Sequence, residues 1–227
     1  MRDLVVCFLK YPQPGHVKTR LGKDLGNVGA SELYAAIAER VITEIYPLSE
    51  LYELILCTEP SHNLHEFRTW IGDNWTFWQQ EGADLGQRLA FAAETAFFEG
   101  FERVIFIGTD CIGMDESFIQ SAFQSLDSHD VVIGPSTDGG YYLLGIREPS
   151  RWLFEDIPWS TETVLKETLD RIDNQQCRHF LLEEKLDVDT MEDLIKFREE
   201  LPEEHFLATK IDHIISDRLT PPEHLKS

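Results

Sequence analysis

Residues 4–23 read LVVCFLKYPQPGHVKTRLGK, an apolar run followed by a basic loop. The six apolar residues at 4–9 have the continuity of a strand that is buried on both faces. The loop at 10–23 holds four basic residues, two prolines and two glycines, and no acid. In α/β proteins the ligand binds in loops of this kind, at the carboxyl ends of parallel strands.

Further short apolar runs alternate with amphipathic stretches along the rest of the chain. The runs predict strands, and the stretches, with apolar residues at helical spacing, predict helices. The expected strands are 53–58, 75–79, 103–108, 130–134, 141–146 and 177–182. The expected helices are 31–45, 62–71, one from 84, 115–126, one after the Trp-Ser-Thr at 159–161, and 190–200 with Thr190 as N-cap.

Strand–helix alternation predicts a single Rossmann-like α/β domain with a mostly parallel, mixed sheet and helices on both faces. We expect this domain to span residues 1–200. The polar tail at 201–227 follows it, with a short helix at 205–218.

The formal net charge of −21 argues against nucleic acid or an anionic membrane as a partner, since both repel an acidic surface. Small molecules or other proteins are the expected partners. The four cysteines form no CxxC pair and no zinc-like cluster with histidines. The apolar run near the N-terminus is too short for a signal peptide, so we expect a cytoplasmic protein.

The basic loop stands out in so acidic a chain. Lys18, Thr19 and Arg20 lie near the start of the next element, where fixed cations and backbone N–H groups can cradle a phosphate. The alternative is a solvated basic turn. We expect the side chains of Lys18 and Arg20 to be accessible to solvent.

Two later loops carry carboxylates that could hold a divalent cation. Asp110 comes directly after the apolar run 103–108, and Asp189 follows the last expected strand. Each also has a structural alternative: Asp110 could cap the next turn, and Asp189 could favour a helix dipole. Cys111 has no identifiable base beside it, so we expect a small packed thiol.

Two glycine-containing loops have similar ambiguities. Gly82 and Gly86 flank Asp84, which predicts either a helix N-cap or a backbone-lined pocket for a flat base. The Asp138-Gly139-Gly140 sequence predicts either a hairpin turn or a close approach of a ligand to the backbone.

Six motifs in order resemble one known family: FLKYPQPGHVKTRL, GADLGQRL, FIGTDC, GPSTDGGYYLLG, IPWSTETVL and DVDTMEDL. They resemble the radical-SAM- and selenodomain-associated glycosyltransferase family of the nucleotide-diphospho-sugar transferase superfamily, which has the GT-A fold. The resemblance covers roughly residues 3–200 and not the tail.

The resemblance implies a nucleotide site, an acceptor site and a site for Mg²⁺ or Mn²⁺. Lys18, Arg20 and Asp110 look like catalytic residues, and Asp110 and Asp189 look like the metal pair. The expected nucleotide-binding residues are Lys10, Gly15, Lys18, Arg20, Leu85, Gly86 and Gln87. The expected acceptor-binding residues are Asp138, Gly139, Gly140, Trp159, Ser160 and Thr161.

The resemblance implies a metal-dependent transferase that uses a nucleoside triphosphate or a nucleotide sugar. Lys18, Arg20 and the single aspartate at 110 favour nucleotidylyl transfer to a small phosphorylated acceptor. The usual description of the family favours glycosyl transfer, although no DxD motif lies at 110 and Ile112 replaces the usual proline. A non-catalytic nucleotide-binding module is the further alternative. We expect the strand-end loops to converge on one cleft.

Overall fold

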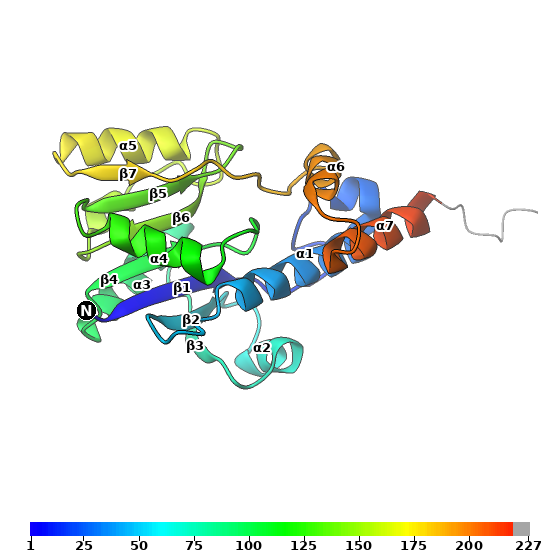
Figure 1. Cartoon of the computed structure of the whole chain (residues 1–227), viewed down its shortest axis with the longest axis horizontal. Helices are drawn as coiled ribbons and strands as arrows, with labels where there is room; N and C mark the ends of the chain where they lie inside the picture. The colour runs from blue at the N-terminus through cyan, green and yellow to red at the C-terminus, as the bar shows by residue number, and fades with distance from the viewer. Residues whose placement is uncertain (220–227) are drawn as a thin grey trace, which may run out of the picture. The chain divides into compact units, whose positions relative to one another are not determined.

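The computed structural model describes residues 1–219, with side chains described through residue 216 (Figure 1). The chain forms two compact units. Unit 1 consists of Met1–Tyr11 and Val41–Asp187, and unit 2 of Pro12–Arg40 and Val188–Ser227. Within the described residues, no helix is long and apolar enough to cross a membrane.

Strands and helices alternate along the chain. The strands are β1 (Asp3–Leu9), β2 (Glu53–Thr58), β3 (Thr76–Gln79), β4 (Arg103–Ile107), β5 (Val131–Pro135), β6 (Tyr141–Ile146) and β7 (His179–Leu181). The helices are α1 (Gly22–Glu44), α2 (Leu64–Ile71), α3 (Leu85–Phe98), α4 (Glu116–Ser125), α5 (Val164–Asn174), α6 (Met191–Glu200) and α7 (Phe206–Leu219), with the 3-10 helix η1 (Arg151–Leu153).

All seven strands belong to one sheet in unit 1, in the order β3-β2-β1-β4-β6-β5-β7. β6 runs antiparallel to both of its neighbours, and the other pairs are parallel. The mostly parallel, mixed sheet predicted from the sequence is therefore confirmed.

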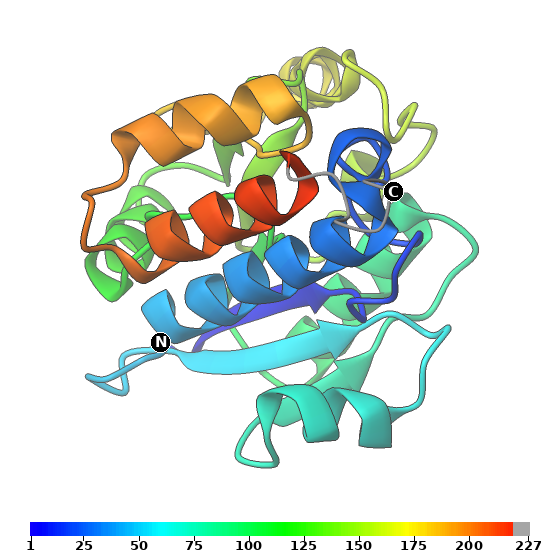
Figure 2. The ribbon, with the colours of Figure 1, turned by 90° about the vertical axis from the view of Figure 1, so that its right-hand side faces the viewer.

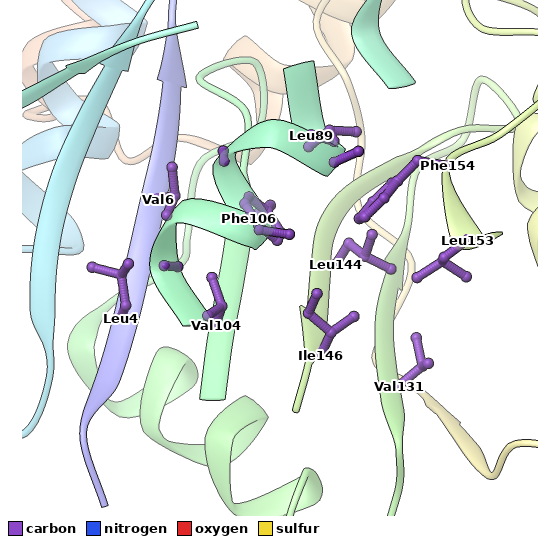
Figure 3. Close-up of a cluster of buried hydrophobic side chains, with 14 of the residues drawn as sticks. Leu4, Val6, Leu89, Val104, Phe106, Val131, Leu144, Ile146, Leu153 and Phe154 are labelled. Atoms are coloured by element: carbon purple, nitrogen blue, oxygen red, sulfur yellow. The ribbon is translucent and has the colours of Figure 1, made fainter. Parts of the chain in front are cut away.

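Helices of unit 1 cover both faces of this sheet. The buried strands carry apolar side chains on both faces, so each face packs against a layer of helices. On one face, Val6 and Phe106 pack with Leu89 of α3 and Phe154 (Figure 3). On the other, Leu126 at the end of α4 packs near Gly145 of β6.

Unit 2 is helical. Residues 22–40 of α1 belong to it, and α6 and α7 lie side by side (Figure 2). Arg198 of α6 binds Asp212 of α7 through Nε at 2.9 Å and Nη2 at 2.8 Å. α7 confirms the short helix predicted in the tail, and residues 220–227 of that tail lie outside the described residues.

Most predicted elements are confirmed, with small shifts in their ends. The main difference is α1, which begins at Gly22 and not at residue 31. The added stretch contains Gly26, whose backbone is non-helical (φ 70°), so the helix is kinked there. Glycine lowers helix propensity, and this is why the sequence pattern did not indicate a helix before residue 31.

Candidate functional site

The carboxyl edge of the sheet in unit 1 gathers several of the predicted site residues. β1 pairs in parallel with β4, so Lys10 after β1 and Asp110 after β4 lie at the same edge. β5 also ends at this edge and β6 begins there, which places the Asp138–Gly140 turn beside them. Strand direction alone brings these loops to one edge, as expected of a parallel sheet.

The loop before α3 is held by its own side chains. Asp84 is the N-cap of α3 and accepts the N–H of Gln87 at 2.8 Å. The Gln87 amide in turn contacts Asp84 Oδ2 (3.0 Å) and the N–H of Ala83 (3.2 Å). This reciprocal cap confirms the N-cap alternative for Asp84. The contact of Leu85, Gly86 and Gln87 with a nucleotide stays a prediction.

The Asp138–Gly140 turn joins β5 to β6 as a hairpin, as its sequence predicts. Asp138 Oδ1 accepts the Ser136 hydroxyl (2.5 Å) and the Gly140 N–H (2.9 Å). Gly139 has φ 87°, and a Cβ there would lie 2.1 Å from the Glu162 carbonyl oxygen. Glycine is therefore required by the backbone, and the turn packs against the start of α5.

The second predicted acceptor segment lies near this turn. Trp159 meets Tyr141, the residue after the turn, edge to face at 6.3 Å between ring centroids. Ser160 has φ 65° and Asp156 has φ 51°, a left-handed conformation that is uncommon for residues other than glycine. Ser160 and Thr161 are exposed.

A pocket of about 470 Å³ lies between α3 and the segment 151–159 in unit 1. Its lining includes two predicted nucleotide-contacting residues, Gly86 and Gln87, and one predicted acceptor residue, Trp159. Gly86 is a close-approach position, since a Cβ there would lie 2.5 Å from Trp159 Nε1 and 2.4 Å from the Phe154 carbonyl oxygen. The structure thus brings two separately predicted groups into one pocket wall.

Asp84 also lines the pocket, in the loop predicted either to cap a helix or to line a pocket. The remaining lining residues were not predicted from the sequence. They are Ala90, Arg151, Phe154, Glu155, Asp156 and Ile157. The residues from 151 to 157 precede the Trp-Ser-Thr motif and carry no motif of their own. The mixture of acids and aromatics within a few residues of Trp159 was the available signal.

In unit 2, Lys18 and Asp189 form a salt bridge of 3.0 Å between Nζ and Oδ1. The Lys18 side chain is only 2% exposed and that of Asp189 is 35% exposed. The expectation that Lys18 is accessible to solvent is therefore wrong. A buried ammonium group needs a counter-charge, and Asp189 provides one.

The rest of the basic loop has a defined backbone. Lys18 itself has φ 44°, and its carbonyl oxygen accepts the N–H of Gly22 at 2.8 Å. Gly15 has φ 83° and approaches the side chain of Asn27. Arg20 is exposed, as expected.

The carboxylates predicted to hold a metal can be tested against this geometry. Asp110 lies in unit 1 and is half-buried, whereas Asp189 lies in unit 2 with one oxygen on Lys18. Among the described residues, no group of three or more His, Cys, Asp or Glu side chains could hold an ion. Mg²⁺ is usually held by one or two carboxylates plus substrate phosphates, so the metal-binding role of Asp110 and Asp189 stays a prediction.

A polar cluster beside Lys10 also lay outside the predictions. Glu59, after β2, accepts the Tyr11 N–H and the Ser61 hydroxyl and lies 3.0 Å from His62 Nδ1. Burial alone would raise the pKa of Glu59, but these hydrogen bonds hold that pKa below its usual value. The Tyr11 ring stacks on His62 at 4.6 Å. The cluster fixes Tyr11, the last residue of the first segment of unit 1.

The cysteines near this edge are structural. Cys111 is buried, as expected. Burial also raises the pKa of the Cys57 thiol to about 12, so it stays protonated and is a poor nucleophile at neutral pH.

Comparison with known proteins identifies the family. The model of the family described as "Uncharacterized protein conserved in bacteria (DUF2064)" matches residues 46–161. The chain belongs to the DUF2064 family. A crystal structure described as a "putative nucleotide-diphospho-sugar transferase" from Desulfovibrio desulfuricans G20 is 31% identical, with a TM-score of 0.87 over 96% of this chain and 99% of that one. No curated protein matches significantly.

More distant solved structures share the fold alone. A cytidylyltransferase from Leptospira borgpetersenii is 17% identical, with a TM-score of 0.54, and the alignment covers 96% of this chain and 95% of that one. Glucosyl-3-phosphoglycerate synthase from Mycobacterium tuberculosis, in complex with Mn²⁺, UDP and phosphoglyceric acid, is 15% identical. Its TM-score is 0.54, over 98% of this chain and 80% of that one. The DUF2064 chain therefore has the nucleotide-diphospho-sugar transferase-like fold.

Proposed function

We propose that this DUF2064 protein is a metal-dependent transferase that takes a nucleoside triphosphate or a nucleotide sugar as its donor. The observation that carries the proposal is the set of chemistry-bearing loops at the carboxyl edge of the sheet. Lys10, Asp110 and the Asp138–Gly140 turn follow different strands and lie at that edge. The relative that is 31% identical and bears a transferase description supports it.

In this proposal the basic loop of unit 2 binds the donor phosphates. Arg20 is exposed and can form charge-assisted hydrogen bonds with phosphate oxygens. Lys18 is held at 3.0 Å by Asp189, and this contact places its ammonium group beside the carboxylate that would hold the cation. Asp189 thus compensates the buried charge of Lys18.

Asp110 and Asp189 would hold the Mg²⁺ or Mn²⁺, which when bound neutralises phosphate charge. Asp189 keeps its second oxygen for this role while its first accepts from Lys18. The side chains of this chain position the donor and balance its charge, and such positioning supplies most of the catalysis in phosphoryl and nucleotidyl chemistry.

Two reactions fit this arrangement. In nucleotidylyl transfer, an acceptor oxygen attacks the α-phosphorus and pyrophosphate leaves. In glycosyl transfer, the acceptor oxygen attacks the anomeric carbon and the nucleoside diphosphate leaves. The basic loop favours the first reaction, and the description of the 31% identical relative favours the second.

The leaving group distinguishes the two reactions. The protein is incubated with Mg²⁺ or Mn²⁺, a panel of nucleoside triphosphates and nucleotide sugars, and a mixture of acceptors. Pyrophosphate release indicates nucleotidylyl transfer, and nucleoside diphosphate release indicates glycosyl transfer. Binding of nucleotide without any turnover across the panel would instead favour a non-catalytic nucleotide-binding module.

A further inference from the structure

The pocket between α3 and the segment 151–159 has a charge pattern that restricts its ligand. We propose that it binds the acceptor of the proposed transfer as a neutral, polyhydroxylated group, such as an unphosphorylated sugar or polyol. Only the role of this ligand as the acceptor rests on the proposed function. The chemical class of the ligand follows from the pocket itself.

The pocket is acidic. Asp84, Glu155 and Asp156 line it, against a single cation, Arg151. Arg151 Nη1 lies 2.8 Å from Glu94 Oε1, and its Nε lies 3.5 Å from Glu155 Oε1. The charge of Arg151 is therefore already compensated by two carboxylates.

This charge balance disfavours a phosphorylated ligand. Phosphate recognition uses uncompensated Arg or Lys side chains, or backbone N–H groups directed at the ligand. Here the N–H of Gln87 at the start of α3 is taken by Asp84. The lining carries three carboxylates and one guanidinium, and that guanidinium already contacts Glu155 and Glu94, so a phosphate here would meet a net negative surface.

The same lining suits hydroxyl groups. Carboxylates accept short, strong hydrogen bonds from O–H donors, and the carboxylates of Glu155 and Asp156 are exposed. Trp159 adds an apolar surface with a polar edge, on which the C–H face of a sugar ring can pack. A volume of about 470 Å³ lies within the range of small-molecule sites.

Two backbone features position Trp159 and Asp156 in the wall of the pocket. Trp159 lies so close to Gly86 that a Cβ at this position would overlap the indole ring. Asp156 adopts a left-handed backbone that costs free energy, and strain of this kind concentrates at functional sites. Both features fix the wall of the pocket next to the predicted nucleotide-contacting loop.

The test is saturation-transfer NMR on the full chain with matched probes. Glucose, galactose, mannose, N-acetylglucosamine and myo-inositol are compared with glucose 6-phosphate, spermidine and guanosine, each at about 10 mM, a level that detects millimolar dissociation constants. Each probe is measured alone and with nucleoside triphosphates and Mg²⁺. We expect at least one neutral polyol to bind, and Trp159→Ala to weaken that binding about tenfold or more.

A charge reversal sharpens the test. Glu155→Lys removes one acid from the pocket and leaves a cation in its place, so we expect preference to shift toward glucose 6-phosphate. Glu99→Lys is the matched control, because it changes net charge equally at an exposed position at the end of α3, outside the pocket lining. The control should leave the preference unchanged.

Several outcomes would overturn the inference. One is that glucose 6-phosphate, spermidine or guanosine binds and no neutral polyol does. Another is that no polyol binds, either alone or with nucleoside triphosphates and Mg²⁺. A third is that a polyol binds but Trp159→Ala does not weaken its binding. The proposed function is judged separately by nucleotide binding. Polyol binding without any nucleotide binding would therefore reject the transferase and leave the pocket assignment intact.

Discussion

Replacing Asp189 by asparagine tests how the basic loop is held. The Lys18 ammonium group lies 3.0 Å from Asp189 Oδ1 and its side chain is 2% exposed, so it depends on nearby carboxylates for compensation. Removing one partner of a fully buried pair costs about 3–5 kcal/mol. Asp189 is 35% exposed, so water offsets part of this loss. We therefore expect Asp189→Asn to lower the free energy of unfolding by about 1–3 kcal/mol.

Urea denaturation measures this change from the midpoint at constant slope. Glu192→Gln is the control within unit 2, because its salt bridge with Lys196 is exposed and removing it should change the stability little. Lys18→Met and the double variant complete a mutant cycle. The reasoning predicts a coupling of about 1–3 kcal/mol, and additivity within about 0.5 kcal/mol would refute a direct Lys18–Asp189 interaction.

Three further predictions concern other parts of the chain. Gly86→Ala should destabilise the protein by about 1–3 kcal/mol, because the new methyl overlaps Trp159, and a thermal melt equal to wild type would contradict this. The backbone N–H of Arg178 donates to Asp130 and lowers the pKa of this carboxyl group. The ionised carboxylate therefore stabilises the fold above its unfolded pKa, and this stabilisation is lost as the pH falls through its folded pKa. Asp130→Asn should reduce the loss of thermal stability between neutral pH and pH 3. Arg20→Ala should weaken nucleotide binding about tenfold with unchanged stability, and equal titrations would reject its phosphate contact.

The sheet could be predicted because its strands are short and apolar, and helices or a tight turn separate them. β2 and β6 match their predicted ranges. β7, at the edge of the sheet, is shorter than its predicted range of 177–182, since an apolar run indicates a strand but not where its backbone pairing ends. The first turns of α1 were missed because Gly26 breaks the helical backbone there.

The sequence could show which loops follow the strand ends, but not the contacts between residues distant in the chain. Lys18 and Asp189 are 171 residues apart in sequence, so nothing local indicates that one buries the other's charge. The pocket wall likewise joins Gly86 to Trp159 across the fold. A sequence motif identifies each residue type, but only the folded chain shows that Arg151 is already neutralised.

Thermal unfolding with nucleotides and Mg²⁺ tests the central claim most directly. We expect one nucleoside triphosphate or nucleotide sugar to stabilise the protein, Mg²⁺ to increase this stabilisation, and Asp110→Asn to remove the increase. A ligand at 100 times its Kd adds about 2.7 kcal/mol, which is a clear shift in Tm. No shift with any nucleotide, with or without metal, would contradict the account.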